Sequence, residues 1–198
     1  MRVSPDNRLR KEIAQEAARL VAVDGFDDYL QAKLKAAQQL GINNRKMLPS
    51  NIEIEAAVIE YQSLFQADTQ PRHLRRLRKL SCKAMKMLAE YQPKLVGPVL
   101  SGTASMNSEI ILHVFVDTPE LIGLFLKQQG IPFEVCERRL SIEKNNPAYY
   151  TAYKFLAEDI EIVLITLPMS LIRQSPVDPV SGGSMKRAGL TEVEKLIH

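Results

Sequence analysis

The chain of 198 residues has 26 lysines and arginines against 23 acidic residues, and its net charge of +3 is too small to indicate a nucleic-acid partner by itself. Its 45% hydrophobic and 25% charged residues are typical of a globular protein of one or two domains and exclude disordered and collagen-like classes. The longest apolar stretch, residues 160–172, is interrupted by polar residues and is well short of the roughly 20 apolar residues of a membrane helix, so we expect no membrane partner.

The first half of the chain predicts four helices. Apolar residues recur there at intervals of three and four, and glycine occurs only at Gly25 and Gly41, each at an expected helix end. Ser50 followed by Glu53 has the spacing of a capping box, which opens the third helix. The expected helices cover residues 5–23, 27–40, 51–66 and 71–91.

After residue 92 the pattern changes to short runs rich in valine and isoleucine, which are typical of strands. We expect strands over residues 96–100, 109–116, 132–141, 149–157 and 161–167, a hairpin loop over 144–147, and one helix between Thr118 and Gly130. A second capping box, Thr191 with Glu194, predicts a short terminal helix. The sequence therefore predicts an α+β protein: an all-helical region over residues 1–92, then a mixed sheet with packed helices over residues 93–198.

The N-terminus and the cysteines indicate the compartment. The first ten residues lack the apolar core and the small-residue cleavage site of a secretory leader, so we expect a cytoplasmic protein. Cys82 and Cys136 fall in an expected helix and an expected strand, and His73, His113 and His198 lack the i,i+4 spacing of two ligands on one helix. We expect neither a disulfide framework nor a zinc site. Nothing in the sequence indicates the oligomeric state.

The segment 99–115 carries the pattern most informative about chemistry. An apolar strand leads into a turn at Gly102 and Thr103, and a second strand is entered through Ser108 and Glu109. This order resembles the nucleotidyltransferase superfamily, which has the polymerase-beta-like fold. In that family a Gly-Ser turn at a helix start holds the triphosphate, and a Ser-Asp-x-Asp strand directs two carboxylates at paired magnesium ions. Carboxylates at i and i+2 on a strand can share metal ions because both point to one face.

The resemblance assigns roles to individual residues. It implies that Gly102, Thr103 and Ser108 bind phosphate and that Glu109 is the first acid of the metal site. The position of the second acid is occupied by Ile111, which cannot bind magnesium. Glu161 is the expected third acid, because it is the one charge within a strand that is otherwise apolar on both faces. A glutamate at a strand end that reaches solvent would show the same pattern.

The whole chain is similar to a group of uncharacterised bacterial nucleotidyltransferase-like proteins, on the blocks 28–37, 48–55, 95–104 and 185–188. The resemblance implies a scaffold shared by transferases, degenerate binders and toxin–antitoxin components, and therefore says more about fold than about activity. We expect a protein that binds a nucleotide or a phosphate-rich partner with a degenerate magnesium site at Glu109 and Glu161. The alternative is an active transferase, in which a further carboxylate such as Asp117 or Asp159 lies within metal reach of Glu109.

Two further features have a functional and a structural interpretation. On the strand 109–116, alternation puts His113 on the same face as Glu109, where it is a candidate general base or phosphate contact, or only a packed side chain. The glycine-rich segment 181–187 contains Lys186 and Arg187. These two cations could close over a phosphate, and the structural alternative is that they belong to a mobile tail.

The fourth expected helix has a basic edge, which we call the basic ridge. Spacings of four and three align its members, Arg72, Arg76, Lys79, Lys83 and Lys86. Such a ridge can follow a nucleic-acid backbone through phosphate contacts, and it supports a third hypothesis, a regulatory nucleic-acid-binding protein. The structural alternative is a solvated helix face. Few aromatic residues interleave with the ridge, so it offers no platform for base stacking.

Overall fold

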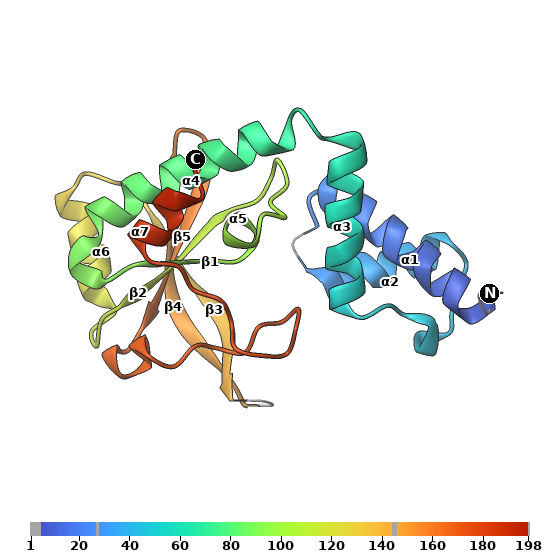
Figure 1. Cartoon of the computed structure of the whole chain (residues 1–198). Helices are drawn as coiled ribbons and strands as arrows, with labels where there is room; N and C mark the ends of the chain where they lie inside the picture. Colours follow the sequence, from blue (N-terminus) through green and yellow to red (C-terminus); the bar gives the residue numbers. More distant parts are fainter. Residues whose placement is uncertain (1–4, 27, 144–145, 198) are drawn as a thin grey trace. The chain divides into compact units, whose positions relative to one another are not determined.

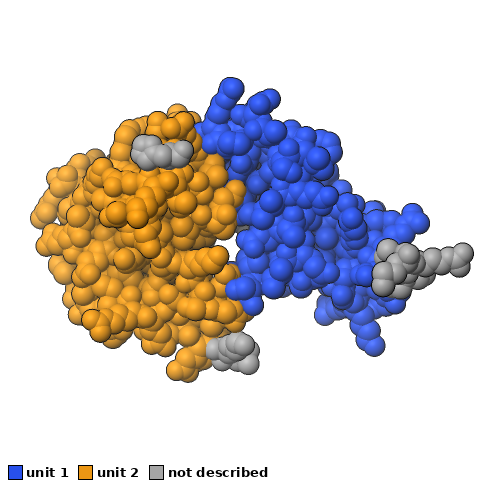
Figure 2. All heavy atoms as spheres, viewed as in Figure 1, with its two compact units in different colours: residues 1–73, 103–108, 179–181 blue, residues 74–102, 109–178, 182–198 orange. Residues whose placement is uncertain are grey.

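The computed structural model describes residues 5–26, 28–143 and 146–197. It confirms the α+β class, with helices in the N-terminal half and a five-stranded mixed sheet in the C-terminal half (Figure 1). Two compact units are distinguished in Figure 2. Unit 1 comprises residues 1–73, 103–108 and 179–181, and unit 2 comprises residues 74–102, 109–178 and 182–198. The change from helix to sheet near residue 92 thus does not coincide with a unit boundary, because most of the fourth helix belongs to unit 2.

Unit 1 is built on three helices, α1 (Pro5–Ala22), α2 (Tyr29–Gln39) and α3 (Asn51–Phe65), with a 3-10 turn η1 (Arg45–Met47) before α3. Their apolar stripes meet in one buried cluster, which includes Ile13, Leu20, Ile54 and Val58. The predicted capping box at Ser50 is present: the Glu53 amide donates to the Ser50 hydroxyl, and the Ser50 amide donates to the Glu53 carboxylate. Asp27 lies outside the described residues, and Asp28 caps α2 by accepting from the Leu30 amide.

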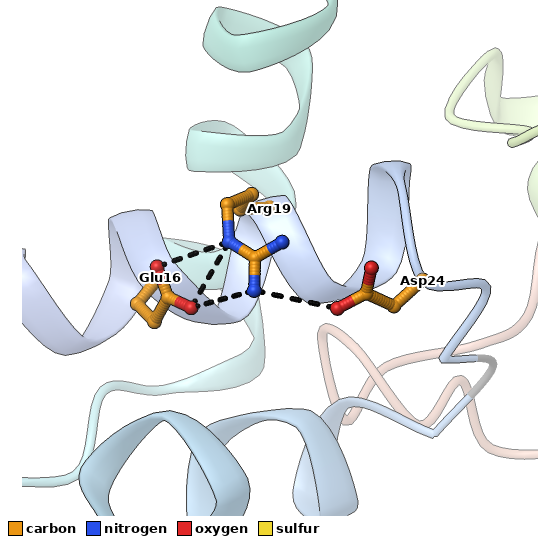
Figure 3. Close-up of polar contacts among 3 residues, drawn as sticks. All are labelled: Glu16, Arg19 and Asp24. Atoms are coloured by element: carbon orange, nitrogen blue, oxygen red, sulfur yellow. Dashed lines mark hydrogen bonds and ion pairs between the residues drawn. The ribbon is translucent and has the colours of Figure 1, made fainter. Parts of the chain in front are cut away.

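The last turn of α1 carries a small ionic cluster, shown in Figure 3. The Nη2 atom of Arg19 lies 2.9 Å from Glu16 Oε1 and 3.3 Å from Asp24 Oδ2. A cation in this position also interacts favourably with the unpaired carbonyl groups at the helix C-terminus. The cluster therefore helps to end α1 where the sequence predicted, just before Gly25.

Unit 2 holds the sheet, whose strands are β1 (Lys94–Val96), β2 (Ile110–Phe115), β3 (Glu134–Glu143), β4 (Asn146–Ala157) and β5 (Ile160–Leu167). Their order is β1-β2-β5-β4-β3. β2 and β5 are parallel, with Ile110 opposite Ile162, and the other neighbours are antiparallel. The helices of this unit are α4 (Gln70–Met87, which begins in unit 1), α5 (Pro98–Ser101), α6 (Glu120–Gln128) and α7 (Leu190–Lys195).

Different elements cover the two faces of the sheet. On one face Tyr153 packs against α6 at Gly123 and donates to the Pro119 carbonyl. On the other face Phe115 and Ile165 belong to a buried cluster to which the 3-10 helix η3 (Met169–Ile172) contributes. The strand registers place Glu109, Ile111, His113, Glu161, Lys154 and Arg138 on this second face, which we call the η3 face.

Several boundaries differ from the sequence-based expectation. The strand expected over 96–100 ends at Val96, because Gly97 has a φ of 71° and Pro98 then begins the helix α5. The fourth helix ends at Met87 and is followed by a 3-10 turn, η2 (Ala89–Tyr91). The predicted Thr191–Glu194 capping box is wrong: α7 begins at Leu190, and the Gly189 amide donates to Glu192. Of the expected 144–147 loop, Lys144 and Asn145 lie outside the described residues, and Asn146 already belongs to β4.

None of the helices in the described ranges combines the length and apolar character needed to cross a bilayer.

Candidate functional site

The predicted carboxylate pair lies on the η3 face at the start of β2. Glu109 directly precedes β2 and Glu161 is the second residue of β5, so the parallel register that pairs Ile110 with Ile162 aligns the two glutamates. Their carboxyl groups lie close enough to interact with each other. The two glutamates therefore lie side by side at the starts of neighbouring parallel strands.

Two cations, from strands β3 and β4, form ion pairs with these glutamates. Arg138 Nη2 of β3 lies 2.7 Å from Glu109 Oε2, and Lys154 Nζ of β4 lies 2.9 Å from Glu161 Oε2. The four side chains are 20% to 38% exposed, so solvent screens their charges only in part. Burial raises the pKa of Glu161, but hydrogen bonds with Lys154 and Glu109 and the charges of Lys154 and Arg138 outweigh it and leave that pKa below its ordinary value.

The cluster sets two cations against two carboxyl groups. Arg138 pairs with Glu109 and Lys154 pairs with Glu161, so the charges of the cluster balance when both carboxyl groups are ionised.

The cluster does not fit the paired magnesium ions that the resemblance implies. Among the described residues, no group of three histidine, cysteine or acidic side chains is arranged to hold a metal ion. Ile111, which stands in the place of the second acid, packs against the buried cluster of the η3 face. Asp117 follows the opposite end of β2, where its carboxylate accepts from the Met169 amide, and Asp159 is exposed in the turn between β4 and β5. The carboxylates that could bind metal are instead neutralised by side-chain cations.

The predicted phosphate-binding turn is present, but its polarity is reversed. Gly102, with a φ of 95°, ends the helix α5 instead of beginning one, and its amide donates to the Pro98 carbonyl. The guanidinium of Arg78 donates to the carbonyls of Val99 and Leu100 at this helix end. A helix C-terminus presents carbonyl oxygens and a partial negative charge, whereas a helix that binds phosphate does so with the amides of its N-terminus.

Thr103 and Ser108, the other expected phosphate contacts, belong to unit 1 and are buried there. The Thr103 carbonyl accepts from Gln62 of α3, and the Ser108 hydroxyl accepts from the Ser105 amide. These bonds shape the loop over residues 103–108. The role visible for both residues is therefore structural.

His113 is fully buried on the η3 face, and neither ring nitrogen has a hydrogen-bond partner among the described residues. Burial lowers its pKa from 6.5 to about 3, and the positive charge of Arg187 acts in the same direction. The imidazole is therefore neutral near pH 7. This environment does not suit the general base or phosphate contact considered for His113, and it agrees with the alternative of a packed side chain.

Of the two cations near the C-terminus, Lys186 is exposed and Arg187 is built into the fold. The guanidinium of Arg187 donates to the Ser175 hydroxyl and to the Leu171 carbonyl, and it lies 5.4 Å from the centroid of the Phe115 ring. These contacts fasten η3 and the following segment over the η3 face. Arg187 thus has a structural role, which we call the Arg187 clamp, and does not belong to a mobile tail.

The basic ridge of α4 is largely engaged inside unit 2. Arg76 donates to the Glu158 carbonyl, Lys83 lies 2.7 Å from the Glu158 carboxylate, and Lys86 lies 2.9 Å from Glu194 of α7. Arg72 and Lys79 are exposed. All five cations of the ridge are exposed, but three of them already have partners within unit 2, which weakens the hypothesis of nucleic-acid binding.

Sequence reasoning missed the two cations that define the site. Lys154 and Arg138 are charges within strands that carry several others, and alternation alone shows which face each occupies but not which strand lies beside it. β5 and β4 separate β2 from β3 in the sheet, and the side chain of Arg138 nevertheless reaches Glu109 across the η3 face. No protein-family model and no curated protein matches this chain. The functional argument therefore stands on the geometry.

Proposed function

We propose that the chain is a nucleotidyltransferase-like protein that binds a nucleotide or another phosphate-bearing ligand and has no two-metal transferase activity. The observation that carries this proposal is the cluster of Glu109, Glu161, Arg138 and Lys154, in which two side-chain cations stand against the carboxylates. The same cluster has the two acids aligned on neighbouring parallel strands, as the resemblance implies for this family.

The chemistry of the cations suits phosphate. Arg138 offers a planar fork of N–H donors that matches two phosphate oxygens, and Lys154 adds a compact point charge. Both groups bind phosphate oxygens without the help of a metal ion. We place this binding in the cytoplasm.

Calorimetric titration of the full chain tests the binding. Each nucleoside triphosphate, the corresponding diphosphates and inorganic phosphate are titrated in the presence of EDTA. We expect at least one to bind, with affinity weakened about tenfold or more in Arg138→Gln and Lys154→Gln, which corresponds to about 1.4 kcal/mol or more. Lys127→Gln, which removes an exposed cation of α6, is the control and should leave affinity unchanged. Equal affinity in all four proteins would refute the assigned site.

A transfer assay separates this proposal from the active-enzyme alternative. The protein is incubated with each labelled nucleoside triphosphate, magnesium or manganese, and protein or RNA acceptors. We expect no label transfer, because Ile111 leaves the site one carboxylate short and the remaining acids are paired with cations. Transfer that disappears in both Glu109→Gln and Glu161→Gln would establish the active transferase instead.

A further inference from the structure

The ion pairs of Arg138 and Lys154 also bear on which cations the carboxylate pair can bind. Each glutamate has a side-chain cation within 3 Å, at 2.7 Å for Glu109 and 2.9 Å for Glu161. The charges of Arg138 and Lys154 both act on Glu161. Each cation therefore acts on the pair as a whole and not only on its nearest carboxylate.

A divalent ion at this place would meet two obstacles. Magnesium demands near-octahedral coordination by about six oxygens at about 2.0–2.1 Å, and its carboxylate ligands must be ionised. Here one oxygen of each carboxyl group is already paired with a cation, Glu109 Oε2 with Arg138 and Glu161 Oε2 with Lys154. An incoming metal ion would also be repelled by two positive charges at short range in a half-buried site, where screening is incomplete.

The backbone positions of both cations are set by strand pairing. Lys154 is held opposite Val163 by the antiparallel register of β4 and β5, and Arg138 is held opposite Tyr150 by that of β3 and β4. Both cations thus come from the interior of paired strands, not from loops that could withdraw them. They are fixed partners of the acids.

We propose that Arg138 and Lys154 are built-in counter-cations that exclude divalent metal ions from the Glu109–Glu161 pair, and that removing both cations converts the pair into a divalent-cation site. This inference goes beyond the proposed ligand binding and does not depend on it, because it is tested with the metal alone. Failure to bind any nucleotide would leave it intact.

The experiment is a titration of the full chain with MnCl2 at about pH 8. Binding is measured by calorimetry and by the electron paramagnetic resonance signal of free Mn2+. We expect the unaltered protein to show no site tighter than about 1 mM. The double variant Arg138→Gln/Lys154→Gln should bind Mn2+ at least about tenfold more tightly. Adding Glu161→Gln to that double variant should abolish the gain.

A matched control distinguishes local pairing from overall charge. Lys79→Gln/Lys127→Gln removes two exposed cations of unit 2 and should bind Mn2+ no better than the unaltered protein. A gain equal to that of the site variant would overturn the proposal, as would Mn2+ binding by the unaltered protein that Glu109→Gln removes. If circular dichroism shows that the double variant is unfolded, Lys154→Gln alone must show a gain in affinity. A folded variant without gain refutes the proposal.

Discussion

Replacing His113 by leucine should remove a large part of the acid sensitivity of unit 2. The side chain is fully buried and its pKa in the folded protein is about 3, against an ordinary value of 6.5. The unfolded chain therefore binds a proton that the folded chain does not, and stability contributed above pH 6.5 is lost as the pH falls toward 3. Between about pH 7.5 and about pH 5, this linkage lowers the free energy of unfolding by about 2 kcal/mol.

The assay is urea denaturation of the full chain followed by far-ultraviolet circular dichroism, because the chain contains no tryptophan. The stability difference between His113→Leu and the unaltered protein should shift by about 2 kcal/mol in favour of the variant over that pH interval. Ile165→Val, opposite His113 on β5, is the control: it should cost about 1 kcal/mol at every pH. Parallel pH curves for His113→Leu and the unaltered protein would refute the assignment of a buried, neutral imidazole.

Three further stability predictions are checked by the same denaturation assay. Arg78→Met should lower the free energy of unfolding by about 2 kcal/mol, because the guanidinium donates to three carbonyls at the ends of α5 and α7. Lys83→Met breaks only an exposed ion pair and should lower the free energy of unfolding by less. Gly97→Ala should lower the free energy of unfolding by about 2 kcal/mol, because residue 97 has a φ of 71° and a ψ of −156°, a conformation that strains any residue other than glycine. Gly189→Ala, at a φ of −79°, should leave the free energy of unfolding nearly unchanged. Ser50→Ala should cost about 1 kcal/mol through loss of the capping box of α3.

The helical half shows how much local signals can decide. Gly25 and Gly41, with positive φ, follow the ends of α1 and α2, and the Ser50–Glu53 box opens α3 at the expected residue. These features depend on residues within one turn of each other, so the sequence contains them in full. The error at Thr191 has the same origin. Its spacing fits a capping box, but the Gly189–Glu192 pair fits the backbone bonds of α7 better.

The candidate site was half predictable. The sequence shows that Glu109 and Glu161 each stand at the start of an apolar run, and only the resemblance assigned both residues to one site. The burial of His113 did not follow, because alternation indicates the face of a strand but not what covers it. That cover is η3 with the Arg187 clamp, from residues more than fifty positions further along the chain.

The sequence by itself determined the α+β class, most of the helices, and which side chains share a face of each strand, because helix caps and strand alternation are properties of neighbouring residues. Only the tertiary structure decided the strand order, the polarity of the Gly102 turn, and the pairing of Glu109 with Arg138 across two intervening strands. The physical reason is that strand pairing and sheet twist join residues far apart in the chain, and no local period specifies which distant segment becomes the neighbour.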